Sequence, residues 1–196
     1  MKANQLDILI IPGYQGSDAD HWQSRWQAKL STAKRVEQAD WDKPQRDIWV
    51  KTLQQTIQSA HRPILLIGHS LGVATIIHML AKQFESASSS VANSFSKVPN
   101  IKGLFLVAPP DLDNPLLEPT LLRNFGAYPR QRLAVPSVLI ASQNDPYCTF
   151  KAAQNLGKAW GSLVLDAGES GHINSESGHG PWPEGLLILS QFLARL

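Results

Sequence analysis

Five consecutive residues in the first half of the chain, Gly68-His69-Ser70-Leu71-Gly72, have types and a spacing that could make a serine reactive. They follow an apolar run over 63–67 with the length and composition of a buried strand, and they precede an apolar stretch over 73–80 that favours a helix. A Gly-x-Ser-x-Gly turn between a strand and a helix is sharp, and its glycines remove side chains that would clash there. The pattern therefore predicts an exposed serine nucleophile, which would attack a carbonyl carbon.

A serine hydroxyl is a weak nucleophile at neutral pH, so it needs a neighbouring base and a third group that orients the base. In α/β-hydrolases these groups follow the serine in the order Asp or Glu, then His, each in a loop after a strand. Here an apolar run over 136–142 leads to Asp145, and a run that ends at Asp166 leads to His172. We therefore expect a catalytic triad of Ser70, Asp145 and His172.

Other side chains could fill the same roles. The alternatives are Asp111, Asp113, Asp166 and Glu169 for the acid, His179 for the base and Cys148 for the nucleophile. The order of the strands favours Asp145, because Asp111 and Asp113 follow an earlier strand. His172 comes sooner after the last strand than His179. No elbow surrounds Cys148, so we expect a buried small residue there.

The tetrahedral intermediate of such a reaction carries an oxyanion, which requires preorganised hydrogen-bond donors. The backbone N–H of Leu71 at the start of the helix is the first expected donor. The second usually comes from the loop after an early strand, and Pro12-Gly13-Tyr14 follows the apolar run over 6–11. We assign the second donor to Tyr14, with Gln15 as the alternative.

The elements that must position these residues alternate between strands and helices, and the strands are continuously apolar. This pattern predicts a mostly parallel central sheet with helices on both faces, in a single domain that spans residues 1–196. Further strands are expected over 35–39 and 101–108. One helix is expected to follow a cap at Asp18 or Asp20, and a second to begin at Pro44. Two more helices are expected over 149–160 and 186–196. Residues 84–99 break this pattern, and the polar run over 86–90 is expected to form an exposed loop. A short helix around 116–125 could overhang the site.

Composition excludes several classes of protein. The formal net charge of +2, with Lys and Arg scattered along 196 residues, indicates neither nucleic-acid nor membrane binding. The single cysteine excludes an internal disulfide, and no Cys/His spacing indicates a metal site. We expect no cofactor. The apolar stretch near the N-terminus is too short for the core of a signal peptide, so we expect a cytoplasmic protein.

With these residues identified, the chain resembles the family of small serine hydrolases that includes the retinoblastoma-binding serine hydrolase. The matching segments are Pro12-Gly13, His21-Trp22, Trp41, Pro44, Trp49, residues 68–72, Asn144-Asp145-Pro146, Gly171-His172-Ile173-Asn174, Gly178 and Trp182-Pro183. The resemblance implies an α/β-hydrolase fold with no large cap domain and the triad given above. It also implies that His21, Trp22 and Trp182 line or support the site, and we expect His21 and Trp182 to bind the substrate. Tyr14-Gln15 departs from the smaller residues that relatives often have.

These observations favour a serine hydrolase that cleaves a small or medium ester or amide substrate through an acyl-enzyme intermediate. One alternative is a protein-binding module on the same fold, in which the triad is vestigial or secondary; the sequence itself indicates no protein partner. Another is a non-hydrolytic enzyme such as a lyase or an acyltransferase, because a fold does not determine its chemistry.

Overall fold

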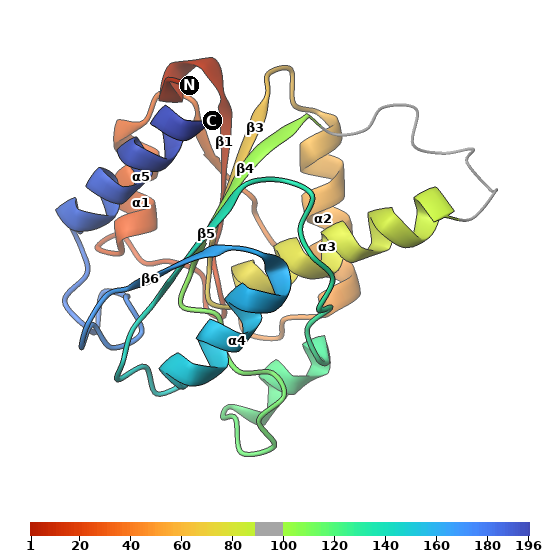
Figure 1. Ribbon diagram of the computed structural model, residues 1–196, viewed down its shortest axis with the longest axis vertical. Coiled ribbons are helices and arrows are strands. Elements are labelled where there is room, and N and C mark those ends of the chain that lie inside the picture. Colours follow the sequence, from red (N-terminus) through yellow and green to blue (C-terminus); the bar gives the residue numbers. More distant parts are fainter. Residues whose placement is uncertain (89–99) are drawn as a thin grey trace.

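A computed structural model describes the backbone of residues 1–88 and 100–196 and the side chains of residues 1–82 and 100–196. In this part of the chain, six strands form one sheet in the order β2-β1-β3-β4-β5-β6, and every neighbouring pair is parallel. The strands are β1 (Asp7–Ile11), β2 (Ala33–Arg35), β3 (Ile64–His69), β4 (Ile101–Val107), β5 (Ser137–Ala141) and β6 (Leu163–Asp166). Figure 1 shows the sheet between two layers of helices.

Each face of the sheet has its own layer of helices. The helices are α1 (Trp22–Lys29), α2 (Arg46–Gln58), α3 (Leu71–Ser88), α4 (Phe150–Trp160) and α5 (Pro183–Arg195), with 3-10 turns η1 (Ala3–Gln5) and η2 (Thr120–Phe125). The core on one face joins α2, α3 and α4 to alternate strand residues such as Leu66 and Leu104. The core on the other face joins α1 and α5 to the intervening residues, among them Ile67 and Phe105. The predicted parallel sheet with helices on both faces is therefore confirmed.

The central strands are buried on both faces because their residues are apolar without alternation. Every residue of β3 and of β5 is buried, as expected for strands covered from both sides. Between β4 and β5 the described chain contains only η2 as regular structure, so these residues form no large cap domain.

Several element boundaries differ from the sequence predictions. β2 lies at 33–35 and not at 35–39, because this short edge strand has no apolar run to mark it. Helix α3 continues to Ser88, so the loop predicted over 86–90 is wrong for residues 86–88; residues 89–99 lie outside the described backbone. The N-cap of α1 is His21, whose side chain accepts a hydrogen bond from the Gln23 amide, and not Asp18 or Asp20.

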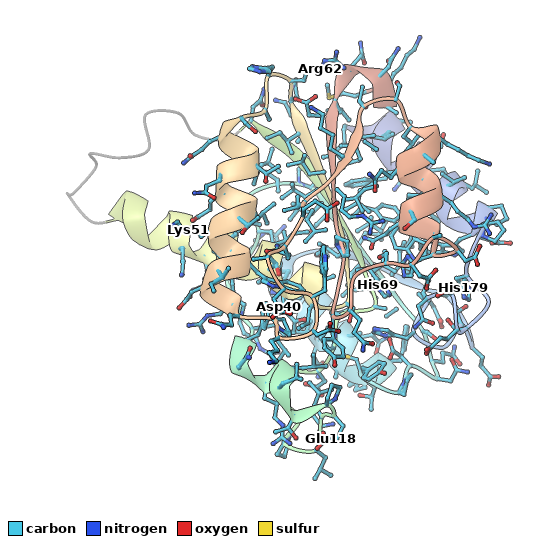
Figure 2. The ribbon with its side chains drawn as sticks, turned by 180° about the vertical axis from the view of Figure 1, so that it is seen from behind. Asp40, Lys51, Arg62, His69, Glu118 and His179 are labelled. Carbon is cyan, nitrogen blue, oxygen red and sulfur yellow. The ribbon has the colours of Figure 1, made fainter. Side chains whose placement is uncertain are left out.

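Parallel pairing places the loops that follow β1, β3, β5 and β6 at one edge of the sheet. These loops carry Gly13, Ser70, Asp145 and His172. In Figure 2 His69 marks this end of β3, whereas Arg62, just before β3, lies at the opposite end of the molecule. Among the described residues, no helix combines the length and apolar character needed to cross a membrane.

Candidate active site

Ser70 occupies a strained turn between β3 and α3. Its φ of 54° lies in the left-handed region, which non-glycine residues adopt rarely and which clusters at functional sites. The Ser70 amide donates to the Val107 carbonyl at 3.0 Å, so the turn is tied to the end of β4. A Cβ atom on Gly72 would lie 2.0 Å from the Ile11 carbonyl oxygen, and one on Gly68 would lie 2.7 Å from Ile76. Gly72 is therefore required for the close approach of β1 and α3, and Gly68 for that of β3 and α3.

Asp145 and His172 form a buried pair beside this turn. Nδ1 of His172 lies 2.9 and 3.0 Å from the two carboxylate oxygens of Asp145, and the two side chains are 9% and 2% exposed, respectively. The Tyr147 amide donates to Asp145 Oδ1 at 2.9 Å. A carboxylate only accepts hydrogen bonds, so Nδ1 of His172 donates, and Nε2 is left with the lone pair that a general base uses.

The loops that carry these two residues are also joined directly. Asn144 Oδ1 accepts hydrogen bonds from the Gly171 amide at 2.7 Å and from the Ser142 hydroxyl at 2.8 Å. The Ser142 hydroxyl in turn accepts from the Ser170 amide at 2.9 Å. The residues on either side of the pair are thus linked by hydrogen bonds, which holds the acid and the imidazole at a constant separation.

Aromatic rings enclose the His172 imidazole. Tyr147 meets it edge-on with ring centroids 4.5 Å apart, and the His69 ring lies 4.9 Å away. The His21 ring in turn lies 4.8 Å from the His69 ring. Burial lowers the pKa of His21 to about 4 and the pKa of His69 well below its usual value of 6.5. Two neutral imidazoles therefore stand behind His172, and they add no positive charge to its surroundings at neutral pH.

The loop after β1 lies against Ser70. A Cβ atom on Gly13 would be 2.6 Å from Ser70 Cβ and 3.1 Å from Ser70 Oγ, so the Gly13 backbone approaches the serine side chain closely. The Gln15 amide donates to the Trp41 carbonyl at 3.0 Å. This N–H already has a partner and is therefore not free to donate to an oxyanion. This arrangement favours Tyr14 over Gln15 as the second donor. Leu71 is the first residue of α3, where backbone N–H groups have no partner within the helix.

The alternative acids have other partners. Asp113 pairs with Arg130, and Asp166 accepts from the Gln143 side chain at 2.7 Å. The Asp111 carboxylate accepts from the Asp113 amide at 3.2 Å, and Glu169 is exposed.

The surroundings of His179 and Cys148 also do not favour a catalytic base or nucleophile. The His179 ring faces Trp182 at a centroid distance of 6.2 Å, and its Nδ1 lies 3.4 Å from the Ser177 hydroxyl. Cys148 is buried, and burial raises the pKa of its thiol to about 12, which suppresses the reactive thiolate.

His21 and Trp182, the expected substrate-binding residues, both lie in the interior. Their exposed fractions are 3% and 5%, and Trp182 stacks on Trp26 within the core beneath α1 and α5. This placement favours support of the site over direct contact with a ligand. Within residues 1–82 and 100–196, no group of three or more His, Cys, Asp or Glu side chains is placed to hold a metal ion.

Sequence reasoning did not identify His69, Tyr147 and Asn144 as neighbours of His172. Asn144 and Tyr147 lie within two positions of Asp145, the predicted acid. Their nearness to Asp145 in the sequence is a signal that could have placed them near His172. His69 belongs to the elbow, but its contact with His172 joins residues 103 positions apart, and no local pattern predicts it.

Comparison with known proteins identifies relatives of this chain. The sequence profile of a family described as "Serine hydrolase" matches residues 8–191. The candidate hydrolase YdeN of Bacillus subtilis is 24% identical over 199 residues, which cover 96% of each chain. A crystal structure of a candidate YdeN-like hydrolase from Pectobacterium atrosepticum superposes with a TM-score of 0.79 at 33% identity, covering 97% of this chain and 91% of that one. The structure of the Bacillus subtilis ydeN product gives a TM-score of 0.71 at 20% identity, covering 96% and 99%.

Proposed function

Because the chain belongs to the serine hydrolase family and has the α/β-hydrolase fold, we propose that it cleaves a small or medium ester or amide through an acyl-enzyme formed on Ser70. The single observation that carries this proposal is the buried Asp145–His172 pair, 2.9 Å apart, beside a serine with a φ of 54°. A nucleophile, a base and an orienting acid in this order are what acyl transfer requires.

In the proposed first half-reaction, Ser70 Oγ attacks the substrate carbonyl carbon, and Nε2 of His172 accepts the hydroxyl proton. Asp145 accepts the Nδ1 hydrogen bond and stabilises the imidazolium that forms. The backbone N–H groups of Leu71 and Tyr14 would donate to the oxyanion. As the bond to the leaving group breaks, His172 transfers its proton to the departing alcohol or amine.

The second half-reaction repeats these roles with water. His172 accepts a proton from water, the hydroxide attacks the acyl carbon, and the ester bond to Ser70 breaks as His172 returns the proton to Oγ. Neutral His21 and His69 leave His172 as the imidazole that cycles between charge states. The narrower resemblance to the retinoblastoma-binding branch and the cytoplasmic location remain predictions of the sequence.

A fluorophosphonate probe tests the proposal, because covalent labelling needs a working Ser–His pair. The wild-type protein should be labelled, with the adduct located on Ser70 by peptide mass spectrometry. Ser70→Ala should stay folded by circular dichroism and lose both labelling and ester hydrolysis, with a loss in kcat on the order of 10⁶. A folded wild-type protein that is not labelled would contradict the proposal and favour the protein-binding alternative. Labelling with transfer to an acceptor in place of water would favour an acyltransferase.

A further inference from the structure

Two consecutive backbone carbonyls at the candidate base each accept a hydrogen bond from a buried aromatic side chain. Nε2 of His69 donates to the carbonyl oxygen of His172 at 2.9 Å. Nε1 of Trp22 donates to the carbonyl oxygen of Ile173 at 2.9 Å. Both donors are almost fully enclosed, with exposed fractions of 4% for His69 and 0% for Trp22. These two bonds join the loop after β6 to the elbow and to the first residue of α1.

The backbone that these donors hold is strained. Ile173 has a φ of 49°, a left-handed conformation that is a clear outlier for a β-branched residue. Its side chain is 0% exposed and packs in the same core as Trp22 and Trp182. The turn thus sends Ile173 into the core while the preceding residue, His172, points its ring at Asp145. A conformation of this kind persists only where its surroundings hold it in place.

The donor role of His69 is determined by its protonation state. A carbonyl oxygen accepts and does not donate, so His69 must carry a hydrogen on Nε2. Burial keeps His69 neutral, because it lowers the pKa of this imidazole well below 6.5. The same hydrogen bond therefore persists across the whole neutral pH range.

We propose that Trp22 and His69 are positioning residues for His172, which hold the strained turn at Ile173 so that Nδ1 of His172 meets Asp145. This inference rests on the proposed role of His172 as the general base. Neither residue need touch the substrate. Loss of either donor lets the turn relax and moves the imidazole, so kcat should fall while KM changes little.

A matched pair of tryptophan variants separates positioning from core packing. Trp26 lies on the same helix, is 1% exposed, and packs with its ring centroid 4.6 Å from that of Trp22. Its indole N–H has no hydrogen-bond partner among the described residues. Trp22→Phe and Trp26→Phe therefore remove the same atoms from one core, but only the first removes a hydrogen bond to the loop.

The two variants are compared by the kcat and KM for a p-nitrophenyl ester and by the downfield proton NMR resonance of the His172–Asp145 hydrogen bond. For Trp22→Phe we expect kcat to fall on the order of 10- to 100-fold, a loss typical of a small misplacement of a catalytic group, with a shifted or lost resonance. Trp26→Phe should keep kcat and the His172–Asp145 resonance near their wild-type values. Equal effects of the two variants on kcat and on the resonance would overturn the inference.

A second pair tests the same inference at His69. His69→Gln keeps an N–H donor near the position of Nε2, whereas His69→Leu removes the donor at a comparable side-chain size. The glutamine variant should retain more activity and more of the native resonance than the leucine variant; equal losses would contradict a donor role. If Trp22→Phe does not fold, the two His69 variants alone test whether a side-chain donor positions His172.

The resonance also separates this inference from the proposed function. If the wild-type protein neither reacts with the probe nor hydrolyses esters, the proposed function fails. Loss of the resonance in Trp22→Phe together with a retained resonance in Trp26→Phe would still support positioning of His172. A resonance that is retained in both variants would overturn the inference.

Discussion

Asp145 and His172 are 27 residues apart in the sequence, yet the His172 imidazole lies within 3.0 Å of both carboxylate oxygens of Asp145. The pair forms because β5 and β6 are parallel neighbours, so the loops that follow them leave the sheet at the same edge. Burial of both side chains strengthens their interaction, because little water competes for the hydrogen bonds.

Replacing the acid should remove the orientation of the base. Asp145→Asn is nearly the same size, but its amide can donate to Nδ1 and so favours the wrong imidazole tautomer. We expect kcat to fall on the order of 10⁴-fold with the fold retained. Steady-state kinetics with a p-nitrophenyl ester measure the effect, and Asp111→Asn is the control, which should keep most of the activity. A fully active Asp145→Asn would assign the acid elsewhere.

The two histidines of the loop after β6 should differ sharply. His172→Ala should lose activity nearly as completely as Ser70→Ala, because nucleophile and base act as a unit and their losses do not add. His179→Ala should keep most of its kcat, since the His179 ring faces Trp182. Probe labelling and ester hydrolysis measure both variants, and an inactive His179→Ala beside an active His172→Ala would reverse the assignment.

The loop after β1 should tolerate no side chain at Gly13. In Gly13→Ala the new Cβ would lie 2.6 Å from Ser70 Cβ, so the serine or the loop must move. If the loop moves, the Tyr14 N–H leaves the oxyanion, and removal of one such donor costs kcat on the order of 10²- to 10³-fold. Kinetics of ester hydrolysis and the rate of probe labelling measure the loss. Unchanged rates would show that this loop takes no part in the site.

Stability should fall as the solution becomes mildly acidic. Burial lowers the pKa of His21 and of His78 to about 4, and it lowers the pKa of His69 well below its usual value of 6.5. In the unfolded chain these imidazoles titrate near 6.5, so between pH 6.5 and 4 the unfolded state binds more protons than the folded state. The free energy of unfolding is therefore fully retained above about pH 6.5, and each histidine lowers it by up to about 1.4 kcal/mol per pH unit below that.

Urea unfolding at a series of pH values between 7.5 and 4.5, roughly the window set by these pKa values, measures this dependence. His78→Gln removes one buried imidazole within α3 and should flatten the slope. His61→Gln, a change at an exposed position, is the matched control and should leave the slope unchanged. A wild-type stability that does not vary over this window would contradict the buried, neutral state of these histidines.

Much of the fold and of the candidate site could be predicted because the signals are local. The apolar runs of β3 and β5 indicate buried strands by composition alone, and the order of strands places Asp145 and His172 at one sheet edge with Ser70. Boundaries were less predictable where apolar content is low. β2 consists of Ala33, Lys34 and Arg35, and its place beside β1 follows from pairing with that strand and not from its own residues.

The sequence by itself thus determined the parallel sheet, the strained turn at Ser70 and the sheet edge that the loops with Asp145 and His172 share. Only the tertiary structure decided what holds them. The bond from His69 to His172 joins residues 103 positions apart, and the bond from Trp22 to Ile173 joins residues 151 positions apart. Strand and turn propensities depend on neighbours within a few positions, whereas a side-chain donor finds a distant carbonyl only after the sheet has brought both to one edge.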